Sequence, residues 1–274
     1  MRQAITDQIW AVMGPMVERS KSRLGPPPSL PDRMFFEAIL YWARTGVPWR
    51  DLPSDFGEWS AVYKRLRRWI DSGRLERLFK SMAAQPACDG TLRVMIDSTI
   101  VRAHQHAAGA PKKKGGTAGN AIGRSRGGLS TEIIAVAIDE DGVIAVDLAG
   151  GQRNDAPLAP PVLAKAKDAV GRIDEVLGDK GFDSDKIRDA CLGEHDALPV
   201  IPNKVNRRDP WPWDEVMQET YKERNRVERA FAKAKQFRRF ATRYEKLGEV
   251  FLGVVRLVFG FIHVKKIALS VNTP

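Results

Sequence analysis

Three acidic residues stand at positions where a carboxylate is costly unless it is solvated, paired or bound to a metal ion. Asp97 follows the apolar run 92–96 and Asp179 follows the apolar run 173–177, whereas Glu228 lies inside a long helical stretch. Burial of an unpaired carboxylate is unfavourable, so two strand ends and a helical glutamate can converge on one cation site. Carboxylate oxygens suit Mg²⁺, and two ions about 3.5–4 Å apart can clamp the attacking and leaving oxygens of a phosphodiester. The pattern therefore predicts metal-assisted phosphodiester chemistry, with unrelated surface acids as the alternative.

The helical stretch carries polar groups of complementary chemistry on one stripe. Tyr221, Arg224, Glu228 and Lys235 stand at offsets 0, 3, 7 and 14. At about 100° per residue these offsets fall within roughly 60° of arc. The neighbouring stripe is apolar and is expected to face the core; it consists of Val227, Ala230, Phe231 and Ala234. The polar stripe is therefore available for a substrate.

The same helix is strongly basic. Residues 222–246 hold ten Lys and Arg against three Glu, which would repel one another on a solvated surface but would be neutralised by a phosphate backbone. Arg224, Arg226 and Arg229 flank Glu228 and favour its ionised form, which is the form that binds metal.

The composition of the whole chain agrees with a polyanionic partner. Its net charge is +10, from 44 Lys and Arg against 34 Asp and Glu over 274 residues, which indicates nucleic acid or an anionic membrane surface. Two cysteines give no disulfide framework and favour a reducing cytoplasm, and no export signal is visible. The most apolar segment, 250–271, is interrupted by charged residues at 256, 265 and 266, so we expect a core helix and no membrane span.

The first ninety residues are predicted to be helical. Apolar spacing indicates helices over 5–17, from 31–32 to 45–46, over 60–70 and over 75–82. The third is basic through Lys64, Arg65 and Arg68 and follows a helix and a loop, an order typical of a helix-turn-helix reader of DNA. A small bundle with a solvated basic face is the alternative.

The rest of the chain predicts a mixed α/β domain. Short apolar runs indicate strands at 92–96, 132–138, 143–148, 173–177 and 198–201, and the runs at 132–138 and 143–148 flank an acidic turn typical of a hairpin. Helices are expected over 158–169, 184–192 and 217–242, followed by the apolar helix near the C-terminus.

A glycine-rich basic loop is predicted at 102–130. It contains Lys112, Lys113 and Lys114 and no acidic residue. The loop is interpreted either as a phosphate contact or as a solvated linker.

Two tryptophans precede the basic helix. Trp211 and Trp213 lie between Pro210 and Asp214. Packing against the start of the helix is the simpler interpretation. The other is that an exposed indole beside the active site stacks on an unpaired base.

Several motifs together resemble those of a known family. The spacing of Tyr221, Arg224, Glu228 and Lys235 resembles the signature of bacterial DDE insertion-sequence transposases, and segment 224–231 (RNRVERAF) is similar to the insertion sequence five (IS5) family in particular. Further similar segments cover nearly the whole chain: 46–53 (GVPWRDLP), 96–99 (IDST), 150–155 (GGQRND) and 178–183 (GDKGFD).

The resemblance implies a fold and a site. It implies an all-α, helix-turn-helix-like DNA-binding domain over 1–88 and an RNase H-like catalytic domain over 89–274. It implies that Asp97, Asp179 and Glu228 hold two Mg²⁺ ions, with Mn²⁺ able to substitute. Tyr221, Arg224 and Lys235 would hold the end DNA near these ions.

The resemblance also implies an activity. The protein would bind the ends of its own mobile element, hydrolyse a phosphodiester and transfer the freed 3′-OH to target DNA. It would act at the bacterial nucleoid as a homo-oligomer, at least a dimer on DNA. A structure-specific nuclease of the same fold and a catalytically silent DNA-binding regulator are the rival hypotheses.

Overall fold

The structure is a computed structural model that describes residues 4–21, 29–83, 90–111, 116, 118–151 and 156–270. The three lysines at 112–114, Cys88 and most of the segment 150–155 lie outside these residues, so the predictions made for them concern a part of the chain that the structure does not describe.

Helices form the N-terminal part, as the apolar spacing predicts. The helix α2 ends at Gly46, whose backbone has φ of +77°, a left-handed conformation that favours glycine. A Cβ at this position would also stand 3.0 Å from Cβ of Arg238, so the turn can approach the C-terminal half closely. The elements are α1 (Asp7–Arg19), α2 (Asp32–Thr45), the 3₁₀ turns η1 (Trp49–Asp51) and η2 (Ser54–Phe56), α3 (Trp59–Asp71) and α4 (Arg74–Ala83).

A mixed sheet follows, with strand order β4-β3-β1-β5-β6. Strands β1, β3 and β4 pair antiparallel, and β5 and β6 continue the sheet parallel to β1. Three antiparallel strands followed by two parallel ones make this an RNase H-like sheet, which confirms the predicted fold class. The strands are β1 (Arg93–Ala103), β3 (Gly128–Ala137), β4 (Val143–Gly150), β5 (Glu175–Leu177) and β6 (Leu198–Val200), with the short β2 (Gly123–Ser125) beside β3.

The first strand is longer than the sequence predicts. The expectation that a strand ends before Asp97 is wrong, because β1 continues to Ala103 and Asp97 pairs with Ala135 in its middle. The polar residues at 97–99 interrupt the apolar run, but pairing with β3 continues through Arg102 and keeps the chain extended. The predicted loop at 102–130 is correspondingly shorter.

Helices cover the connections between the later strands. The helix α5 (Ala159–Val170) packs against β4 and β3. The short α6 (Asp185–Asp189) runs into a single π-helical turn, η8 (Ala190–Glu194), before β6. Both helices were predicted within a few residues.

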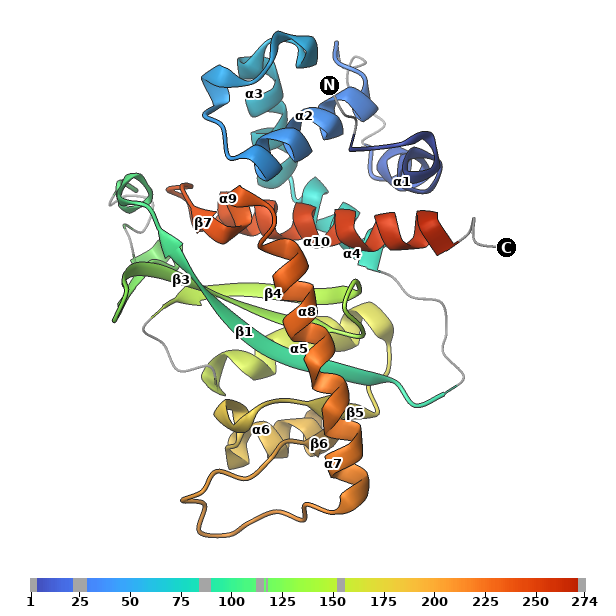
Figure 1. Ribbon diagram of the computed structural model, residues 1–274, viewed down its shortest axis with the longest axis vertical. Helices are drawn as coiled ribbons and strands as arrows, with labels where there is room; N and C mark the ends of the chain where they lie inside the picture. Colours follow the sequence, from blue (N-terminus) through green and yellow to red (C-terminus); the bar gives the residue numbers. More distant parts are fainter. Residues whose placement is uncertain are drawn as a thin grey trace.

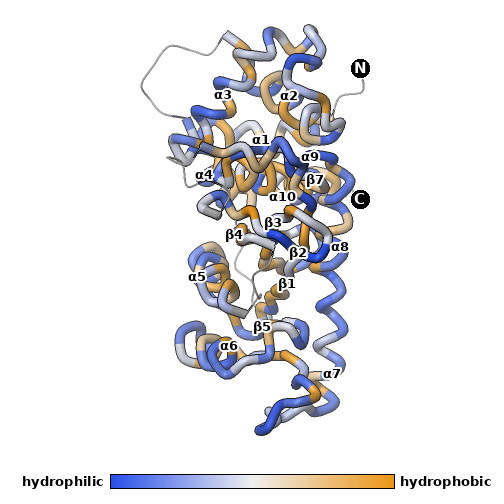
Figure 2. The backbone as a smooth tube through the Cα atoms, turned by 90° about the vertical axis from the view of Figure 1, so that its left-hand side faces the viewer, coloured by the Kyte–Doolittle hydropathy of each residue, from blue (hydrophilic) through white to orange (hydrophobic). Residues whose placement is uncertain are grey.

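The long basic helix predicted over 217–242 is broken. It consists of α7 (Glu215–Tyr221), the 3₁₀ turn η9 (Lys222–Arg224), α8 (Asn225–Ala234) and α9 (Arg238–Ala241). Beyond α8 the chain turns so that Phe237 and Phe240 enter the core. The strand β7 (Thr242–Arg243) then pairs with the far end of β1. Figure 2 shows hydrophilic residues along α7 and α8, on the outer side of the molecule.

The apolar helix α10 (Gly248–Ser270) lies between the N-terminal helices and the sheet (Figure 1). It packs against α4, α1, β4 and α8. One continuous set of buried side chains therefore runs from α1 through α10 into the sheet. None of the described helices is long and apolar enough to cross a bilayer.

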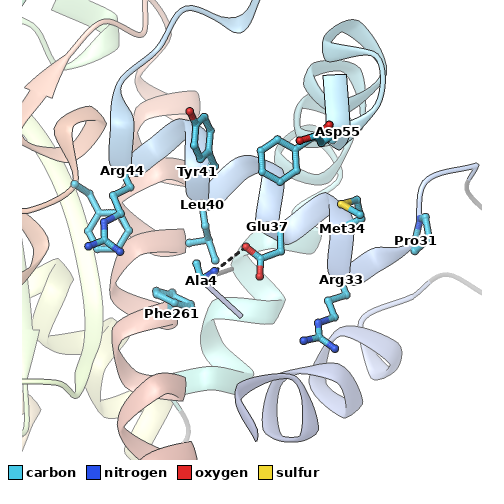
Figure 3. A pocket seen from close by; sticks show the side chains of 12 residues that line it. Ala4, Pro31, Arg33, Met34, Glu37, Leu40, Tyr41, Arg44, Asp55 and Phe261 are labelled. Atoms are coloured by element: carbon cyan, nitrogen blue, oxygen red, sulfur yellow. Dashed lines mark hydrogen bonds between the residues drawn. The ribbon is translucent and has the colours of Figure 1, made fainter. Parts of the chain in front are cut away.

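The joint between α2 and α10 is incompletely filled. A cavity of about 460 Å³ lies there, with Leu40 and Tyr41 of α2 and Phe261 of α10 in its wall (Figure 3). At its edge, the buried carboxylate of Glu37 accepts hydrogen bonds from the backbone N–H groups of Ala4, at 3.0 Å, and Ile5, at 2.6 Å. These bonds hold the segment before α1 against α2.

Candidate active site

The three acids of the predicted site come from three different elements. Asp97 lies in the middle of β1, and Asp179 directly follows β5, which runs parallel to β1 with Met95 opposite Leu177. Asp97 and Asp179 thus each stand two residues beyond this pair, on neighbouring strands. Glu228 lies in the first turn of α8, which packs against β1 and β3. The fold therefore brings the two strand acids and the helical glutamate to one side of the sheet.

The position of Asp179 depends on a glycine. The Asp179 side chain accepts a hydrogen bond of 2.8 Å from the backbone N–H of Gly181, at the start of the 3₁₀ turn η7 (Lys180–Phe182). A Cβ on Gly181 would stand 2.8 Å from the same carboxylate oxygen. Sequence analysis did not identify this role of Gly181, although the residue stands inside the segment 178–183.

Arg224 contacts all three carboxylates. Its guanidinium lies 2.7 Å from Oε1 of Glu228, 3.9 Å from Oδ2 of Asp97 and 4.0 Å from Oδ2 of Asp179. Arg224 is the last residue of the 3₁₀ turn η9, which packs against β1. The sequence predicted Arg224 as a DNA contact; in the structure its charge is directed at the acids.

The three carboxylates do not form a compact set of metal ligands. Among the residues that the structure describes, no three Asp, Glu, His or Cys side chains lie close enough together to hold a metal ion. The three carboxylates nevertheless surround one positive group, and an all-oxygen donor set is the kind that hard divalent cations take. The donor chemistry therefore fits a divalent metal ion, although the three carboxylates would have to move closer together to share one.

Burial disfavours the ionised form of Asp97. Its side chain is 16% exposed, and burial raises the pKa of the Asp97 carboxyl to about 6, against the opposing field of Arg224. Burial disfavours the charged form of Arg224 too, but the Tyr221 hydroxyl and the Asp97 carboxylate raise its pKa above the ordinary value. A positive charge next to Asp97 thus favours the carboxylate form.

The polar stripe is continuous only in part. Nε of Arg224 donates a hydrogen bond of 3.3 Å to the Tyr221 hydroxyl, and the Tyr221 ring lies 5.6 Å from the Trp213 ring, edge to face. Lys235 is exposed and caps the C-terminal end of α8, two helical turns beyond Glu228. The stripe therefore gathers Trp213, Tyr221, Arg224 and Glu228, with Lys235 at some distance.

The other predicted cations of the helix are partly engaged. Arg226 pairs with Glu223 at 3.1 Å, and Arg229 lies 3.6 Å from Glu140 while it donates to Asn225. These groups are partly or fully exposed, so they remain on a surface that a polyanion can reach.

Trp211 stands in a loop held by a buried acid. Asp183, fully buried, accepts hydrogen bonds from Arg188 at 3.0 Å, Arg207 at 2.7 Å and the backbone N–H of Lys204 at 2.7 Å. The Arg188 guanidinium lies 5.1 Å from the centre of the Trp211 ring. Of the two aspartates in segment 178–183, Asp179 thus faces the acids while Asp183 fixes the loop.

The basic helix α3 divides its cations between surface and core. Lys64 and Arg68 are exposed. The prediction of Arg65 as a DNA contact is wrong, because its guanidinium is buried over the Phe35 ring, forms an ion pair with Asp32 and donates to the Leu30 carbonyl. Arg65 therefore holds α3 to the start of α2.

Comparisons with known proteins identify a family. Residues 89–259 match the family described as "Transposase DDE domain", and residues 5–79 match "Putative transposase of IS4/5 family". The chain is 43% identical over 110 residues to the "Uncharacterized protein y4sN" of Sinorhizobium fredii, covering 40% of this chain and 84% of that protein. It is 33% identical over 121 residues to the "Insertion element IS402 uncharacterized 16.2 kDa protein" of Burkholderia cepacia, covering 41% of this chain and 80% of that protein.

A solved structure gives a weaker likeness. The "Mos1 transposase paired-end complex with left transposon end" is 14% identical and covers 80% of this chain and 79% of that one, with a TM-score of 0.26.

The chain belongs to the family of transposases with a DDE domain, and its N-terminal match places it with the IS4/5 type. It is a DNA transposase, an enzyme that cleaves DNA and transfers the cut strand. Enzymes of this family use divalent metal ions.

Proposed function

We propose that Asp97, Asp179 and Glu228 are the catalytic carboxylates and that together they hold two Mg²⁺ ions, with Mn²⁺ able to substitute. The approach of all three carboxylates to the Arg224 guanidinium, within 2.7–4.0 Å, supports the assignment, because it gathers three negative charges around one side chain on one side of the sheet. When bound, such ions activate water and stabilise the attacking and leaving oxygens of a phosphodiester.

The residues of the chain have separate tasks in this proposal. Asp97 and Asp179 would bind both ions and Glu228 would bind one. Arg224 turns from the carboxylates to a non-bridging phosphate oxygen of the bound end, since a guanidinium forms two parallel hydrogen bonds to phosphate as well as to carboxylate. Tyr221, which already contacts Arg224, supports it there, and Lys235 contacts the backbone further along the DNA.

The reaction needs no covalent link between protein and DNA. Water attacks a phosphodiester at the element end and leaves a 3′-OH, and that hydroxyl then attacks target DNA. Two ends must be brought together, so we propose at least a dimer on DNA, acting at the bacterial nucleoid. Segments 46–53 and 224–231 favour the insertion sequence five group within the family.

We propose two domains, 1–88 and 89–274, for end binding and catalysis respectively. Lys64 and Arg68 on α3 would contact DNA phosphates, joined by Arg226 and Arg229 beside the active site. Lys112, Lys113 and Lys114 remain proposed phosphate contacts on the basis of the sequence.

Substitution of the three acids tests the catalytic assignment. Asp97→Asn, Asp179→Asn and Glu228→Gln should each abolish cleavage and strand transfer in Mg²⁺ while the affinity for duplexes carrying the inverted repeats that flank the gene is largely kept. Asp189→Asn and Glu215→Gln, at exposed positions, are the matched controls. Near-wild-type cleavage by any one of the three variants would remove that acid from the site. Cleavage by none of the proteins, with end binding intact, would favour a silent regulator.

The role of Trp211 and Trp213 is a separate proposal. If an indole stacks on a base opened at the cut site, worth about 1–3 kcal/mol, Trp→Ala should slow cleavage of paired ends more than of mismatched ends. The edge-to-face contact of Trp213 with Tyr221 supports a position beside the acids for Trp213. Equal rate losses on both substrates, with a lowered melting temperature, would indicate packing alone.

A further inference from the structure

A second cavity, away from the three acids, is walled by flat aromatic and cationic groups. Its volume is about 490 Å³, and it lies where α3 and the segment after α2 meet α9 and β7. Its wall includes Trp42, Trp49, Tyr63, Arg67, Arg239 and Tyr244. None of the proposed catalytic residues lines it.

The flat groups of this cavity contact one another in a row, and two of them, Trp42 and Trp49, are stacked. The Trp49 ring lies 4.2 Å from the Trp42 ring at an interplanar angle of 19°. The Arg239 guanidinium lies 4.7 Å from the Trp42 ring and 4.9 Å from the Tyr244 ring. Tyr63 closes one end with its ring 5.5 Å from Trp49. Aromatic faces and guanidinium planes are the groups on which nucleic-acid bases stack.

The wall also carries buried donors that have no acceptor. Within the described part of the chain, Nε1 of Trp42, Nη1 of Arg67 and Nε of Arg239 are buried N–H groups without a hydrogen-bond partner. An unpaired buried donor is unfavourable, so a shift of these side chains toward a ligand that carries acceptors would be favourable. Base edges and phosphate oxygens are such acceptors. Arg67 pairs with Asp71 at 2.7 Å and with Glu249 at 3.0 Å, and Arg239 lies 3.6 Å from Glu245, so a phosphate would compete with these carboxylates for the guanidinium groups.

The cavity lies on a path between the proposed end-binding surface and the acids. Tyr63 and Arg67 are on α3 beside exposed Lys64 and Arg68, and α9 and β7 stand between α3 and the sheet (Figure 1). The strand β7 pairs with β1 at Arg102, five residues beyond Asp97. At a rise of about 3.3 Å per residue this separation is roughly 16 Å, or about five base steps of DNA.

We propose that this cavity binds an unpaired nucleotide of the bound DNA, with the base against the Trp49, Tyr63 and Tyr244 rings and its phosphate near Arg67. The inference rests on the proposed action on DNA ends and adds a site that captures a base several steps from the cut. Thymidine serves as the probe base, because stacking is tolerant of base identity.

The test compares two duplexes in EDTA, where no cleavage occurs. The full chain should bind a labelled duplex with one extrahelical thymidine about 5- to 100-fold more tightly than the fully paired duplex, by fluorescence anisotropy. Tyr63→Ala and Tyr244→Ala, at positions 38% and 36% exposed, should each reduce this preference several-fold, and the double variant should abolish it. Tyr63→Phe and Tyr244→Phe should keep it, and Leu192→Ala, at an exposed apolar site, is the control for loss of a large side chain.

Several results would overturn the proposal. An unchanged preference in the folded double alanine variant would do so, and so would loss of the preference in Trp211→Ala alone, which would place the base in the loop before α7. Displacement of the bulged duplex by micromolar thymidine monophosphate would assign the cavity to free nucleotides. If the alanine variants do not fold, 4-thiothymidine at the bulge should crosslink wild-type protein within 42–67 or 239–246, and a crosslink confined to other segments would refute the site.

The outcome is separable from the proposed catalytic function. A chain that cleaves paired ends in Mg²⁺ but shows no preference for the bulge keeps the catalytic assignment and loses this site. A preference for the bulge without cleavage gives the reverse result.

Discussion

Arg224 explains how the fold can gather three carboxylates on one side of the sheet. Like charges a few ångströms apart repel one another, and the repulsion grows as water is excluded. A guanidinium 2.7 Å from Glu228 and about 4 Å from the other two offsets that repulsion. The same group must move if a divalent ion is to take its place, so the charge of Arg224 competes with metal.

Removal of Arg224 should make the protein depend more on divalent ions. Arg224→Gln should lower the free energy of unfolding of the metal-free protein by ~1–3 kcal/mol. The loss is smaller than for a fully buried ion pair, because Glu228 is 54% exposed and solvent screens its charge. Millimolar Mg²⁺ or Mn²⁺ should then raise the melting temperature more in this variant than in the wild type, since a ligand that binds only the folded state stabilises it. Arg226→Gln, which removes a pair with Glu223, is the control. Equal metal-induced shifts in all three proteins would contradict competition at Arg224.

Asp97 should make stability depend on pH. Burial first of all raises the pKa of the folded carboxyl to about 6, above its ordinary 3.8, so the folded protein binds this proton more tightly than the unfolded chain does. The contribution of the Asp97 proton to the free energy of unfolding is therefore favourable below about pH 4, declines between pH 4 and 6, and is lost above pH 6.

The variant Asp97→Asn should remove this cost. In EDTA it should be more stable than the wild type at pH 8, by at most ~3 kcal/mol, and the difference should shrink as pH falls toward 4. Urea unfolding at pH 4.5, 6 and 8 measures it, with Asp189→Asn as the surface control. A difference that does not vary with pH would show that the Asp97 carboxyl is not perturbed as described.

Spacing predicted that Tyr221, Arg224 and Glu228 lie near one another, and Arg224 does contact both of the others. It did not predict that they belong to three elements, α7, η9 and α8, because the break between them is not visible in a helical period. The partners of Asp183, by contrast, lie 5 and 24 residues away and belong to no periodic pattern. For the same reason the burial of Arg65 could not be read from its neighbours, since Asp32 reaches it from another helix.

At the scale of elements, the loop between β6 and α7 depends on one buried acid. Replacing Asp183 by Ala should leave Arg188 buried without its carboxylate and Lys204 N–H without an acceptor. The expected loss is about 3–5 kcal/mol of unfolding free energy. Asp185→Ala, which removes only the exposed end of the Arg207 contact, should cost much less. Comparable losses in the two variants, by chemical denaturation, would contradict this role.

Element boundaries were predictable where apolar runs end in turn residues and not where tertiary pairing decides them. The hairpin at 139–142 and the end of α2 at Gly46 follow from local sequence. The extension of β1 through Asp97 follows from pairing with β3, and the break after Ala234 follows from the entry of Phe237 and Phe240 into the core. Neither partner is visible in the local sequence.

At the scale of the whole molecule, the helical domain is completed by α10. The helix packs on α4 and α1, and a Cβ on Gly260 would stand 2.7 Å from the Met82 sulfur, so the two helices approach closely. A fragment of residues 1–88 lacks this partner and exposes the apolar faces of α1 and α4.

The isolated fragment should therefore be less stable than the same helices in the full chain. We expect residues 1–88 to unfold without a sharp transition, and an added peptide of residues 246–274 to restore cooperative unfolding and binding to end DNA. Circular dichroism and gel shifts measure these properties. A fragment that unfolds cooperatively alone, and prefers end DNA over random DNA, would show that α10 is dispensable for this domain.

The place of α10 between the two halves also affects how the chain folds during synthesis. The first four helices leave the ribosome long before α10, which begins 165 residues after the end of α4. At a translation rate of about 5–20 residues per second, their apolar faces stay uncovered for roughly 10–30 s until α10 is synthesised. A nascent chain in that interval is exposed to chaperones and proteases, and it cannot present a finished DNA-binding surface. Ribosome pausing within residues 84–247 should accordingly lower the yield of active transposase more than pausing beyond residue 270.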